Sequence, residues 1–352
     1  MEHNPENSEF AGIASSRFLE PPPQPSSSDK ALEGKLVYVL ITPARNEAQF
    51  IEQTIESVIA QTVRPLKWII VSDGSTDATD AIVSRYALTN SWIELVRMPV
   101  REERHFAGKV LAFNAGYARL RSAPYDVIVS LDADISIPDR DYFEFLLRKL
   151  VDDPALGLVG TAFQENSASY DYRIVGVEHV SGACQVFRRK CFEDIGGYVP
   201  VKGGGIDHIA VISARMKGWT TRTFTTKSCL HHRAMGTAEH SVLVARFRSG
   251  AKDYAFGGHP LWEFFRMLYQ ISRKPYVVGG LLVGAGFAWA TARRLERPIS
   301  REMVEFRRRD QMRRLRGILV GALSSCLTYV CWWRPNSPFL ARGQCRSNSK
   351  TT

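Results

Sequence analysis

The chain has 352 residues, of which 45% are hydrophobic and 23% are charged, as in an ordinary globular protein with one large or two smaller domains. Its formal net charge of +10 suits an anionic partner such as nucleic acid, a phospholipid surface or a phosphorylated substrate. The six cysteines form no CxxC pair and no metal-type spacing, so we expect mostly buried free thiols in a reducing compartment.

The N-terminal segment is polar and contains the proline- and serine-rich run 21–28. Such a composition cannot bury enough apolar surface to fold, so we expect residues 1–33 to be a disordered tail. The chain does not begin with a basic region followed by an apolar segment. No signal peptide is therefore predicted, and the candidate catalytic residues are expected on the cytoplasmic side.

Two apolar runs, 36–42 and 68–71, are typical of buried strands. Each is followed by a polar loop, 43–47 and 72–77, and then by a helical pattern. Asn46 is the expected N-cap of the first helix. That helix carries the apolar residues Phe50, Ile51, Ile55, Val58 and Ile59. Strand, loop and helix in alternation predict parallel strands with crossover helices, and ligands bind beyond the carboxyl ends of such strands.

A weaker strand at 93–96 precedes the segment 108–116, which has the pattern of a helix that begins at a glycine. Lys109 lies in its first turn. The free N–H groups of that turn and the lysine charge favour a bound phosphate. The alternative is a solvated lysine.

The run 126–131 is rich in β-branched residues and ends in Asp132-Ala133-Asp134. On an extended segment, acids at i and i+2 point to the same side, and they repel each other unless a cation lies between them. Oxygen ligands suit Mg²⁺ or Mn²⁺, shared with substrate phosphates. Two solvated acids in a polar turn are the alternative. We expect both acids at the same sheet edge as Asp73.

In their order and spacing these motifs resemble glycosyltransferase family 2, over roughly residues 35–233. The resemblance is carried by Pro43-Ala44-Arg45-Asn46-Glu47, Asp73-Gly74-Ser75-Thr76-Asp77, Gly108-Lys109, Asn114-Ala115-Gly116 and Asp132-Ala133-Asp134. It implies an α/β fold of the GT-A type, with a mostly parallel sheet flanked by helices. It also implies a nucleotide-diphosphate-sugar donor, a divalent cation (Mg²⁺ or Mn²⁺) and transfer with inversion at the anomeric carbon.

The resemblance also implies roles for single residues. Asp73 would bind the nucleotide base, with Pro43 and Glu47 lining the same pocket, and Asp132 and Asp134 would hold the metal and the diphosphate. The predicted donor-binding residues are Pro43, Ala44, Asn46, Glu47, Asp73, Gly74, Ser75, Lys109, Asn114, Asp132 and Arg233.

The second half of the domain agrees with the resemblance. A strand at 156–161 and an acceptor-side strand within 182–189 precede the glycine run 203–205, which opens a helix. The family commonly carries Glu-Asp at this helix start, but Ile206 replaces the glutamate here. We therefore assign the catalytic base to Asp207, which would take the acceptor hydroxyl proton. A simple helix cap is the alternative role for Asp207.

A strand at 220–225 ends near His231-His232-Arg233. The resemblance implies a third metal or diphosphate ligand from a histidine here, and we choose His232 to complete the metal set with Asp132 and Asp134. Arg233 could pair with a phosphate. A surface histidine pair is the alternative.

We divide the chain into the tail, a glycosyltransferase domain at 34–235, a basic amphipathic helical region at 236–316 and an apolar segment with a polar tail at 317–352. Aromatic and basic residues at 247–254 and 259–269 suit either a helix at a membrane interface or an ordinary core helix.

The uncharged run Val277–Ala292 is shorter than the ~20 residues that a span needs, and both of its flanks are basic. It is therefore predicted as a re-entrant or interfacial helix with both ends cytoplasmic. The run 317–333 is either a single span or an apolar tail.

An arginine-rich patch is expected to attract anionic lipid headgroups. It consists of Arg307, Arg308, Arg309, Arg313, Arg314 and Arg316. Nucleic acid would compete for such a patch, but no recognisable nucleic-acid-binding fold accompanies it, so no nucleic-acid partner is predicted.

The sequence thus predicts an inverting glycosyltransferase at the cytoplasmic face of the cell membrane, attached peripherally or by one C-terminal span, with a lipid-linked or saccharide acceptor. A non-catalytic nucleotide-sugar-binding or scaffold subunit of a polysaccharide assembly complex is the alternative. A nucleotidyltransferase would need a glycine-rich basic loop after the first strand, and 43–47 contains no glycine. No Gln-x-x-Arg-Trp sequence occurs, which favours short additions over processive synthesis.

Overall fold

The computed structural model describes residues 36–100, 107–165, 172, 176–201, 203–233 and 242–332, with the side chains of the last helix described as far as 321. The chain divides after Arg233 into two compact units, whereas the sequence placed the end of the first domain at 235. The predicted tail at 1–33 lies outside the described residues.

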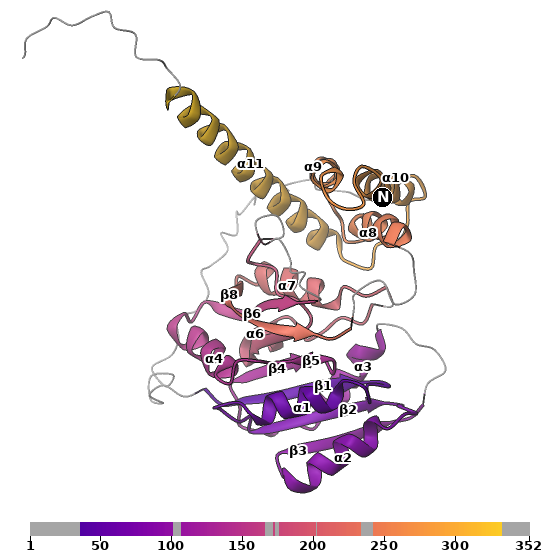
Figure 1. Cartoon of the computed structure of the whole chain (residues 1–352), viewed down its shortest axis with the longest axis vertical. Helices are drawn as coiled ribbons and strands as arrows, with labels where there is room; N and C mark the ends of the chain where they lie inside the picture. Colours follow the sequence, from indigo (N-terminus) through magenta and orange to yellow (C-terminus); the bar gives the residue numbers. More distant parts are fainter. Residues whose placement is uncertain are drawn as a thin grey trace, which may run out of the picture. The chain divides into compact units, whose positions relative to one another are not determined.

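One eight-stranded sheet forms the centre of the first unit, with the order β3-β2-β1-β4-β7-β6-β8-β5 (Figure 1). The strands are β1 (Tyr38–Ala44), β2 (Lys67–Asp73), β3 (Ile93–Met98), β4 (Val127–Leu131), β5 (Ile135–Ser136), β6 (Leu156–Gln164), β7 (Cys184–Arg188) and β8 (Thr220–His231). The strands β3, β2, β1 and β4 are parallel, as are β6 and β8, while β7 runs antiparallel to β4 and β6. The predicted α/β fold with a mostly parallel sheet is confirmed.

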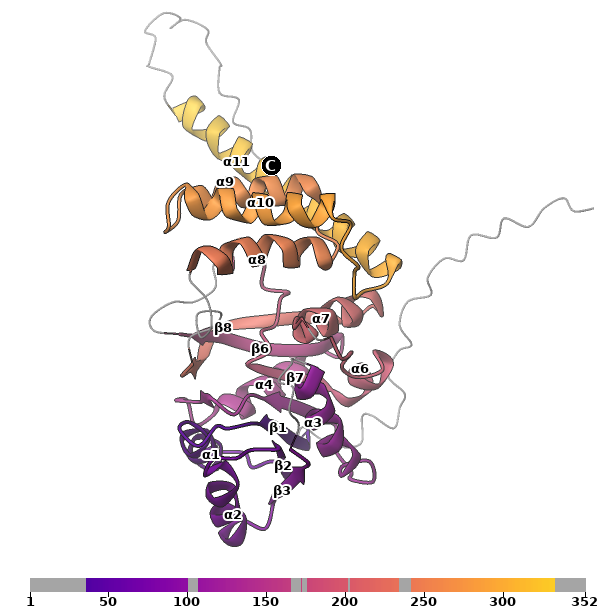
Figure 2. The same cartoon turned by 90° about the vertical axis from the view of Figure 1, so that its right-hand side faces the viewer.

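Helices cover both faces of this sheet (Figure 2). On one side lie α1 (Ile51–Ile59), α2 (Thr79–Thr89) and α4 (Tyr142–Asp152), and on the other α3 (Ala107–Ala118), α6 (Arg189–Asp194) and α7 (Ile206–Met216). The strands between them are buried on both faces, which explains their continuous apolar runs. Three of the cysteines, Cys184, Cys191 and Cys229, are buried free thiols, as expected.

The register of the parallel strands brings their carboxyl ends level. Ala44 of β1 pairs with Ser72 of β2, and Ile41 of β1 pairs with Ser130 of β4. The residues that follow these strands therefore emerge at one edge of the sheet. Asp73 ends β2 and Asp132 directly follows β4, and because these two strands flank β1 they lie about 10 Å apart in the sheet direction.

Helix α3 lies against this part of the sheet because Gly116 has no side chain. A Cβ added at Gly116 would lie 2.9 Å from Cγ2 of Ile41 and 3.0 Å from Cγ2 of Val71. The glycine of the predicted Asn-Ala-Gly motif thus has a packing role. It keeps α3, which carries Lys109, close to the ends of β1 and β2.

The described part of the second unit contains α8 (Val242–Ala255), α9 (Pro260–Ile271), α10 (Val278–Ala292) and α11 (Arg301–Trp332). Glycines let α10 approach its neighbours: a Cβ at Gly286 would overlap the carbonyl of Phe247 in α8, and one at Gly280 would lie 2.6 Å from the carbonyl oxygen of Met267 in α9. The uncharged run at 277–292 is therefore a helix with closely packed glycine faces.

Among the described residues, no helix is both long enough and apolar enough to cross a membrane. Helix α11 continues through the boundary predicted at 316/317, so that boundary is not a break in secondary structure. One part of the predicted arginine patch is also wrong. The side chain of Arg307 is only 12% exposed, and its guanidinium pairs with Asp253 at 2.5 Å and donates to the carbonyl of Phe256 at 2.7 Å.

A buried charge cluster connects three helices of the second unit. Asp253 of α8 pairs with Arg307 of α11 and with Arg266 of α9, whose Nη1 lies 3.2 Å from Oδ1 of Asp253. Although burial raises it, the two guanidinium groups hold the pKa of Asp253 below its usual range. Glu263, also in α9, is 3% exposed. Burial raises the pKa of Glu263 to about 9, against the effect of Arg266 and with a further contribution from the Asp253 carboxylate.

We expect Glu263→Gln to stabilise the protein in alkaline solution. Because the folded pKa of Glu263 is about 9, against an ordinary 4.5, the folded protein keeps this proton over a pH range in which the unfolded chain has already released it, so stability should fall as the pH rises from about 4.5 to about 9. The neutral glutamine removes this loss. Thermal unfolding should show a larger gain in Tm at pH 8 than at pH 5. Glu305→Gln, at an exposed position of α11, is the matched control, and an equal gain at both pH values would contradict the assignment.

Candidate functional site

The loops after β1 and β2 are joined to each other by Asn46. Its backbone has a left-handed φ of 54°, and its Oδ1 accepts a hydrogen bond from the N–H of Thr76 at 2.8 Å. Its own N–H donates to Oγ of Ser75 at 3.1 Å. The prediction that Asn46 caps the first helix is wrong, because α1 begins at Ile51 with Phe50 at the N-cap. Asn46 instead fixes one predicted nucleotide loop against the other.

Glu47 is positioned by Thr79 and Asp77, neither of which was among the predicted donor-binding residues. Its N–H donates to Oγ1 of Thr79 at 2.8 Å, and the Thr79 hydroxyl donates in turn to Asp77 at 2.5 Å. Asp77 also accepts from the N–H of Ala48 at 3.0 Å. The Asp77-Ala78-Thr79 sequence is the signal that could have identified them, since short polar side chains beside a helix start commonly bond to nearby N–H groups.

Asp73, at the end of β2, is only 6% exposed, and its Oδ2 lies 3.9 Å from Nη1 of Arg45. Gly74 follows with φ of 65°, and a Cβ there would lie 2.6 Å from Cα of Val100. Only glycine therefore fits this turn without strain. The turn brings Ser75 to its contact with Asn46 and leaves Asp73 at the sheet edge.

Asp132 forms an ion pair with the ammonium of Lys109, the third residue of α3. Burial raises the pKa of Asp132, which Lys109 lowers and the neighbouring Asp134 carboxylate raises. For Lys109 the balance favours the charged form. Burial lowers its pKa, but the carboxylates of Asp132, Asp207 and Asp134 raise it above the usual value. Three carboxylates thus act on one ammonium.

Asp134 has cationic neighbours of its own. Nε of Arg233 lies 3.7 Å from Oδ2 of Asp134, and Nη2 of the same guanidinium pairs with Glu47 at 2.5 Å. Arg233 also lies over the ring of Phe50, with 5.6 Å from Cζ to the ring centre. Arg233 therefore joins the loop after β1 to the acidic turn after β4.

The structure separates the roles of the two histidines. Nε2 of His231 lies 3.7 Å from Oδ1 of Asp134, and its Nδ1 is buried without a hydrogen bond. His232, the residue chosen from sequence, stacks on Phe50 at 5.9 Å and shares a 2.8 Å hydrogen bond with Oγ of Ser136 through Nε2. His231 is thus the histidine nearer to the predicted metal ligands.

Asp207 lies in the first turn of α7, which begins after Gly205 at the N-cap. Its Oδ2 accepts a hydrogen bond from the N–H of Gly182 at 3.2 Å, and the carbonyl of Gly182 lies 3.5 Å from Nζ of Lys109. The peptide groups of Gly182 thus connect the candidate base to the lysine beside Asp132. Gly182 has little room for a side chain, since a Cβ would lie 3.1 Å from Cβ of Asp207.

Asn114 is the one predicted donor-binding residue that the structure places apart. It is exposed on α3. Five positions along a helix correspond to a rotation of about 140°, so Asn114 does not share the helix face of Lys109. Pro43 and Ala44, in contrast, end β1 beside the other predicted residues.

A hard cation would fit the donor atoms at the end of β4, although the described residues contain no group of three or more His, Cys, Asp or Glu able to hold a metal by themselves. Asp132 and Asp134 offer carboxylate oxygens at one turn, and Nε2 of His231 lies 3.7 Å from Oδ1 of Asp134. Mg²⁺ is usually bound by one or two carboxylates together with substrate phosphates. The residues therefore suit an ion whose coordination a diphosphate completes.

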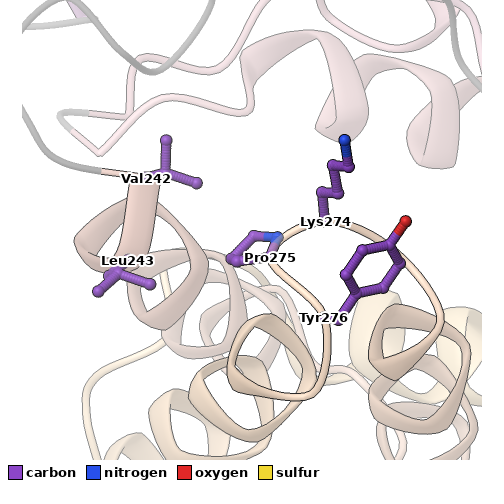
Figure 3. A pocket seen from close by; sticks show the side chains of 5 residues that line it. All are labelled: Val242, Leu243, Lys274, Pro275 and Tyr276. Carbon is purple, nitrogen blue, oxygen red and sulfur yellow. The ribbon is translucent and has the colours of Figure 1, made fainter.

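The second unit has an apolar pocket of its own, with a volume of about 460 Å³. Figure 3 shows its lining, with Val242 and Leu243 from α8 facing Pro275. Lys274 and Tyr276 flank the proline. Several of these side chains are exposed, and Arg246 donates to the carbonyl of Lys274 at 3.2 Å. The pocket therefore combines apolar walls with two basic residues at its margin.

Comparisons with known proteins agree with this geometry. Residues 39–190 match the family model described as Glycosyl transferase family 2. The poly-beta-1,6-N-acetyl-D-glucosamine synthase of Staphylococcus aureus (strain COL) is 32% identical over 137 residues, which is 39% of this chain and 31% of that protein. Glycosyltransferase GlyA of Streptococcus pneumoniae serotype 4 is 28% identical over 139 residues, which is 39% of this chain and 18% of that protein. The chain thus spans less than a third of the length of these curated relatives.

Among solved structures, the mannosyltransferase PcManGT from Pyrobaculum calidifontis in complex with GDP-Man and Mn2+ is similar with a TM-score of 0.50 and 20% identity. The similarity covers 86% of this chain and 82% of that chain. At this level of identity the comparison indicates a shared fold.

We expect Asn46→Ala to destabilise the first unit by about 1–2 kcal/mol, because alanine disfavours a left-handed φ and cannot accept from Thr76. Asn46→Gly is the matched variant, since it tolerates the same φ and loses only the hydrogen bond. Thermal unfolding should rank the proteins wild type, Asn46→Gly and Asn46→Ala in falling Tm. Equal Tm values for the two variants would mean that the backbone conformation contributes nothing.

Proposed function

The chain belongs to glycosyltransferase family 2, and on this basis we propose that it transfers a sugar, with inversion, from a nucleotide-diphosphate sugar to an acceptor hydroxyl group. The observation that carries the proposal is the meeting of Asp132, Asp134 and Asp207 around Lys109 at the carboxyl ends of parallel strands. Ligands bind at this edge of such sheets.

The donor would occupy the loops after β1, β2 and β4. Asp73 and the loop fixed by Asn46 would receive the nucleoside, and Lys109 and Arg233 supply positive charge for the diphosphate. A divalent ion, Mg²⁺ or Mn²⁺, held by Asp132 and Asp134 with His231 or His232 nearby, would stabilise the charge that develops on the leaving diphosphate.

Asp207 would act as the general base. Its carboxylate is oriented by the N–H of Gly182, and it would take the proton of the acceptor hydroxyl as the new bond forms at the anomeric carbon and the bond to the diphosphate breaks. Displacement from the face opposite to the leaving group inverts the anomeric carbon. Because Gly205 and not Asp207 is the N-cap of α7, the capping alternative is disfavoured.

The names of the relatives provide the first donors to test. The staphylococcal synthase is named for a polymer of N-acetyl-D-glucosamine, and the mannosyltransferase structure is a complex with GDP-Man. A nucleotide derivative of N-acetylglucosamine and GDP-mannose are therefore the first candidates. The chain lacks the Gln-x-x-Arg-Trp sequence, so the proposed product is a single or short addition to a lipid-linked or saccharide acceptor.

The second unit supports attachment to the cytoplasmic face of the membrane. Its exposed apolar residues include Leu261, Phe264 and Leu268 on α9, and Leu281 and Trp289 on α10. The basic residues Arg273 and Lys274 lie between these helices and are exposed. Apolar side chains beside basic ones suit an interface with anionic lipid, which would also supply a lipid-linked acceptor.

We expect Asp207→Asn to abolish transfer while donor binding persists, because asparagine keeps the shape of the side chain but cannot take the proton. The measurement is a screen of nucleotide sugars with Mg²⁺ or Mn²⁺, which records transfer or donor hydrolysis together with thermal stabilisation by the donor. A loss of at least 100-fold in kcat is expected.

Asp152→Asn, an exposed change at the end of α4, is the control for this prediction. Transfer by Asp207→Asn at a rate near that of wild type would place the base elsewhere. Donor binding without any turnover by the wild type would favour the non-catalytic nucleotide-sugar-binding subunit.

We expect the double change Arg273→Glu with Lys274→Glu to release the protein from vesicles that contain anionic phospholipid, because it reverses the attraction at the surface of the second unit. Vesicle sedimentation at low salt should show at least a tenfold loss of bound protein. Arg148→Glu with Lys217→Glu, at exposed positions of the first unit, makes the same change in net charge and serves as the control. Equal loss in both double variants would mean that net charge alone governs binding.

A further inference from the structure

Lys109 already binds one of the two carboxylates that a divalent ion would use. Its ammonium pairs with Oδ1 of Asp132 and lies 3.5 Å from the carbonyl oxygen of Gly182. The side chains of Lys109 and Asp132 are 27% and 25% exposed, so water screens this pair only in part. An ion that approaches Asp132 must therefore compete with a positive charge that the protein itself supplies.

The second carboxylate is also balanced by the protein, since Nε of Arg233 lies 3.7 Å from Asp134. The two cations offset part of the negative charge of the two acids when no ligand is bound, although Arg233 also pairs with Glu47. A metal ion therefore gains less binding free energy from Asp132 and Asp134 than it would gain from two carboxylates without neighbouring cations.

We propose that Lys109 is an exchangeable counter-ion, which neutralises Asp132 in the ligand-free enzyme and moves to the donor diphosphate when a divalent ion takes its place on Asp132. The proposal deepens the proposed function and rests on it, because it requires a diphosphate ligand. Lys109 would then also influence the order in which the metal ion and the donor bind.

The exchange follows from the charges involved. An ion that binds Asp132 alone would displace the ammonium from its partner and then repel it. A diphosphate that arrives with the ion offers Lys109 a new anionic partner, which the long and flexible side chain can follow. The ion and the diphosphate should therefore enhance each other's affinity, and thermodynamic linkage makes this effect reciprocal.

The first test measures the binding of Mn²⁺ alone to the full chain by electron paramagnetic resonance, in the absence of nucleotide. We expect Lys109→Met to bind Mn²⁺ about tenfold more tightly than wild type, because Asp132 loses its competing cation. Lys109→Arg keeps the charge and should bind like wild type. Adding Asp132→Asn to Lys109→Met should remove the gain, which would locate the ion at Asp132.

Lys190→Met is the matched control, because Lys190 is also paired with an aspartate, Asp194 at 3.2 Å, but at an exposed position of α6. It should leave Mn²⁺ binding unchanged.

The second test titrates UDP and GDP at saturating Mn²⁺. Here Lys109→Met should bind the nucleotide about tenfold more weakly than wild type, so that the same change strengthens one ligand and weakens the other.

The exchange would be overturned if Lys109→Met bound Mn²⁺ no more tightly than wild type. It would also be overturned if Lys109→Arg gained as much affinity for Mn²⁺ as Lys109→Met. These outcomes are separable from failure of the proposed function. Transfer in the donor screen without Mn²⁺ binding to either protein would overturn the exchange and leave the transferase in place. If Mn²⁺ and nucleotide bind to the variants as expected but no donor gives transfer, the exchange would remain in place and the transferase activity would be contradicted.

Discussion

Acidic side chains can share a partly buried site only if nearby cations offset their mutual repulsion, and this constraint governs the centre of the first unit. Asp132 and Asp134 are two residues apart, and the field of Asp207 reaches the same lysine from another element. Lys109 and Arg233 provide the opposing charge. Without them the acids would protonate or move apart, and the edge of the sheet would lose the charge pattern on which the proposed donor binding depends.

The chain brings these charges together by leaving out side chains at two places. Gly116 lets α3 lie directly on β1 and β2, which sets the position of Lys109. Gly182 has room for little more than a hydrogen atom beside Asp207, and its peptide groups contact both Asp207 and Lys109. The glycines act through the backbone, so their influence on the site depends on packing and not on any chemistry of their own.

The order of motifs was enough to predict the α/β fold and the strands that carry the acids, because apolar runs followed by polar loops are local features of the chain. The partners of each side chain were not local. Asn46 looked like a helix cap, but contacts with Thr76 and Ser75 on the next loop decide its conformation. The choice between His231 and His232 depends on which side of β8 faces Asp134, and strand pairing with β5 sets that orientation. Likewise, the pairing of Arg307 with Asp253 joins positions 54 residues apart, which composition could not reveal.

The apolar segment at 277–292 forms a helix with two kinds of surface, one packed against other helices and one exposed. Gly280 and Gly286 lie against α9 and α8, where a larger side chain would overlap the backbone of the neighbouring helix, while Leu281 and Trp289 remain exposed. A helix buried on all sides would not expose such residues, and a helix facing only water would not carry them. An apolar outer face with Arg273 and Lys274 at its start suits an anionic lipid surface. In the proposed function, a donor site and a lipid-binding unit in the same chain raise the effective concentration of a lipid-linked acceptor at the donor, without any direct contact between site and lipid being required.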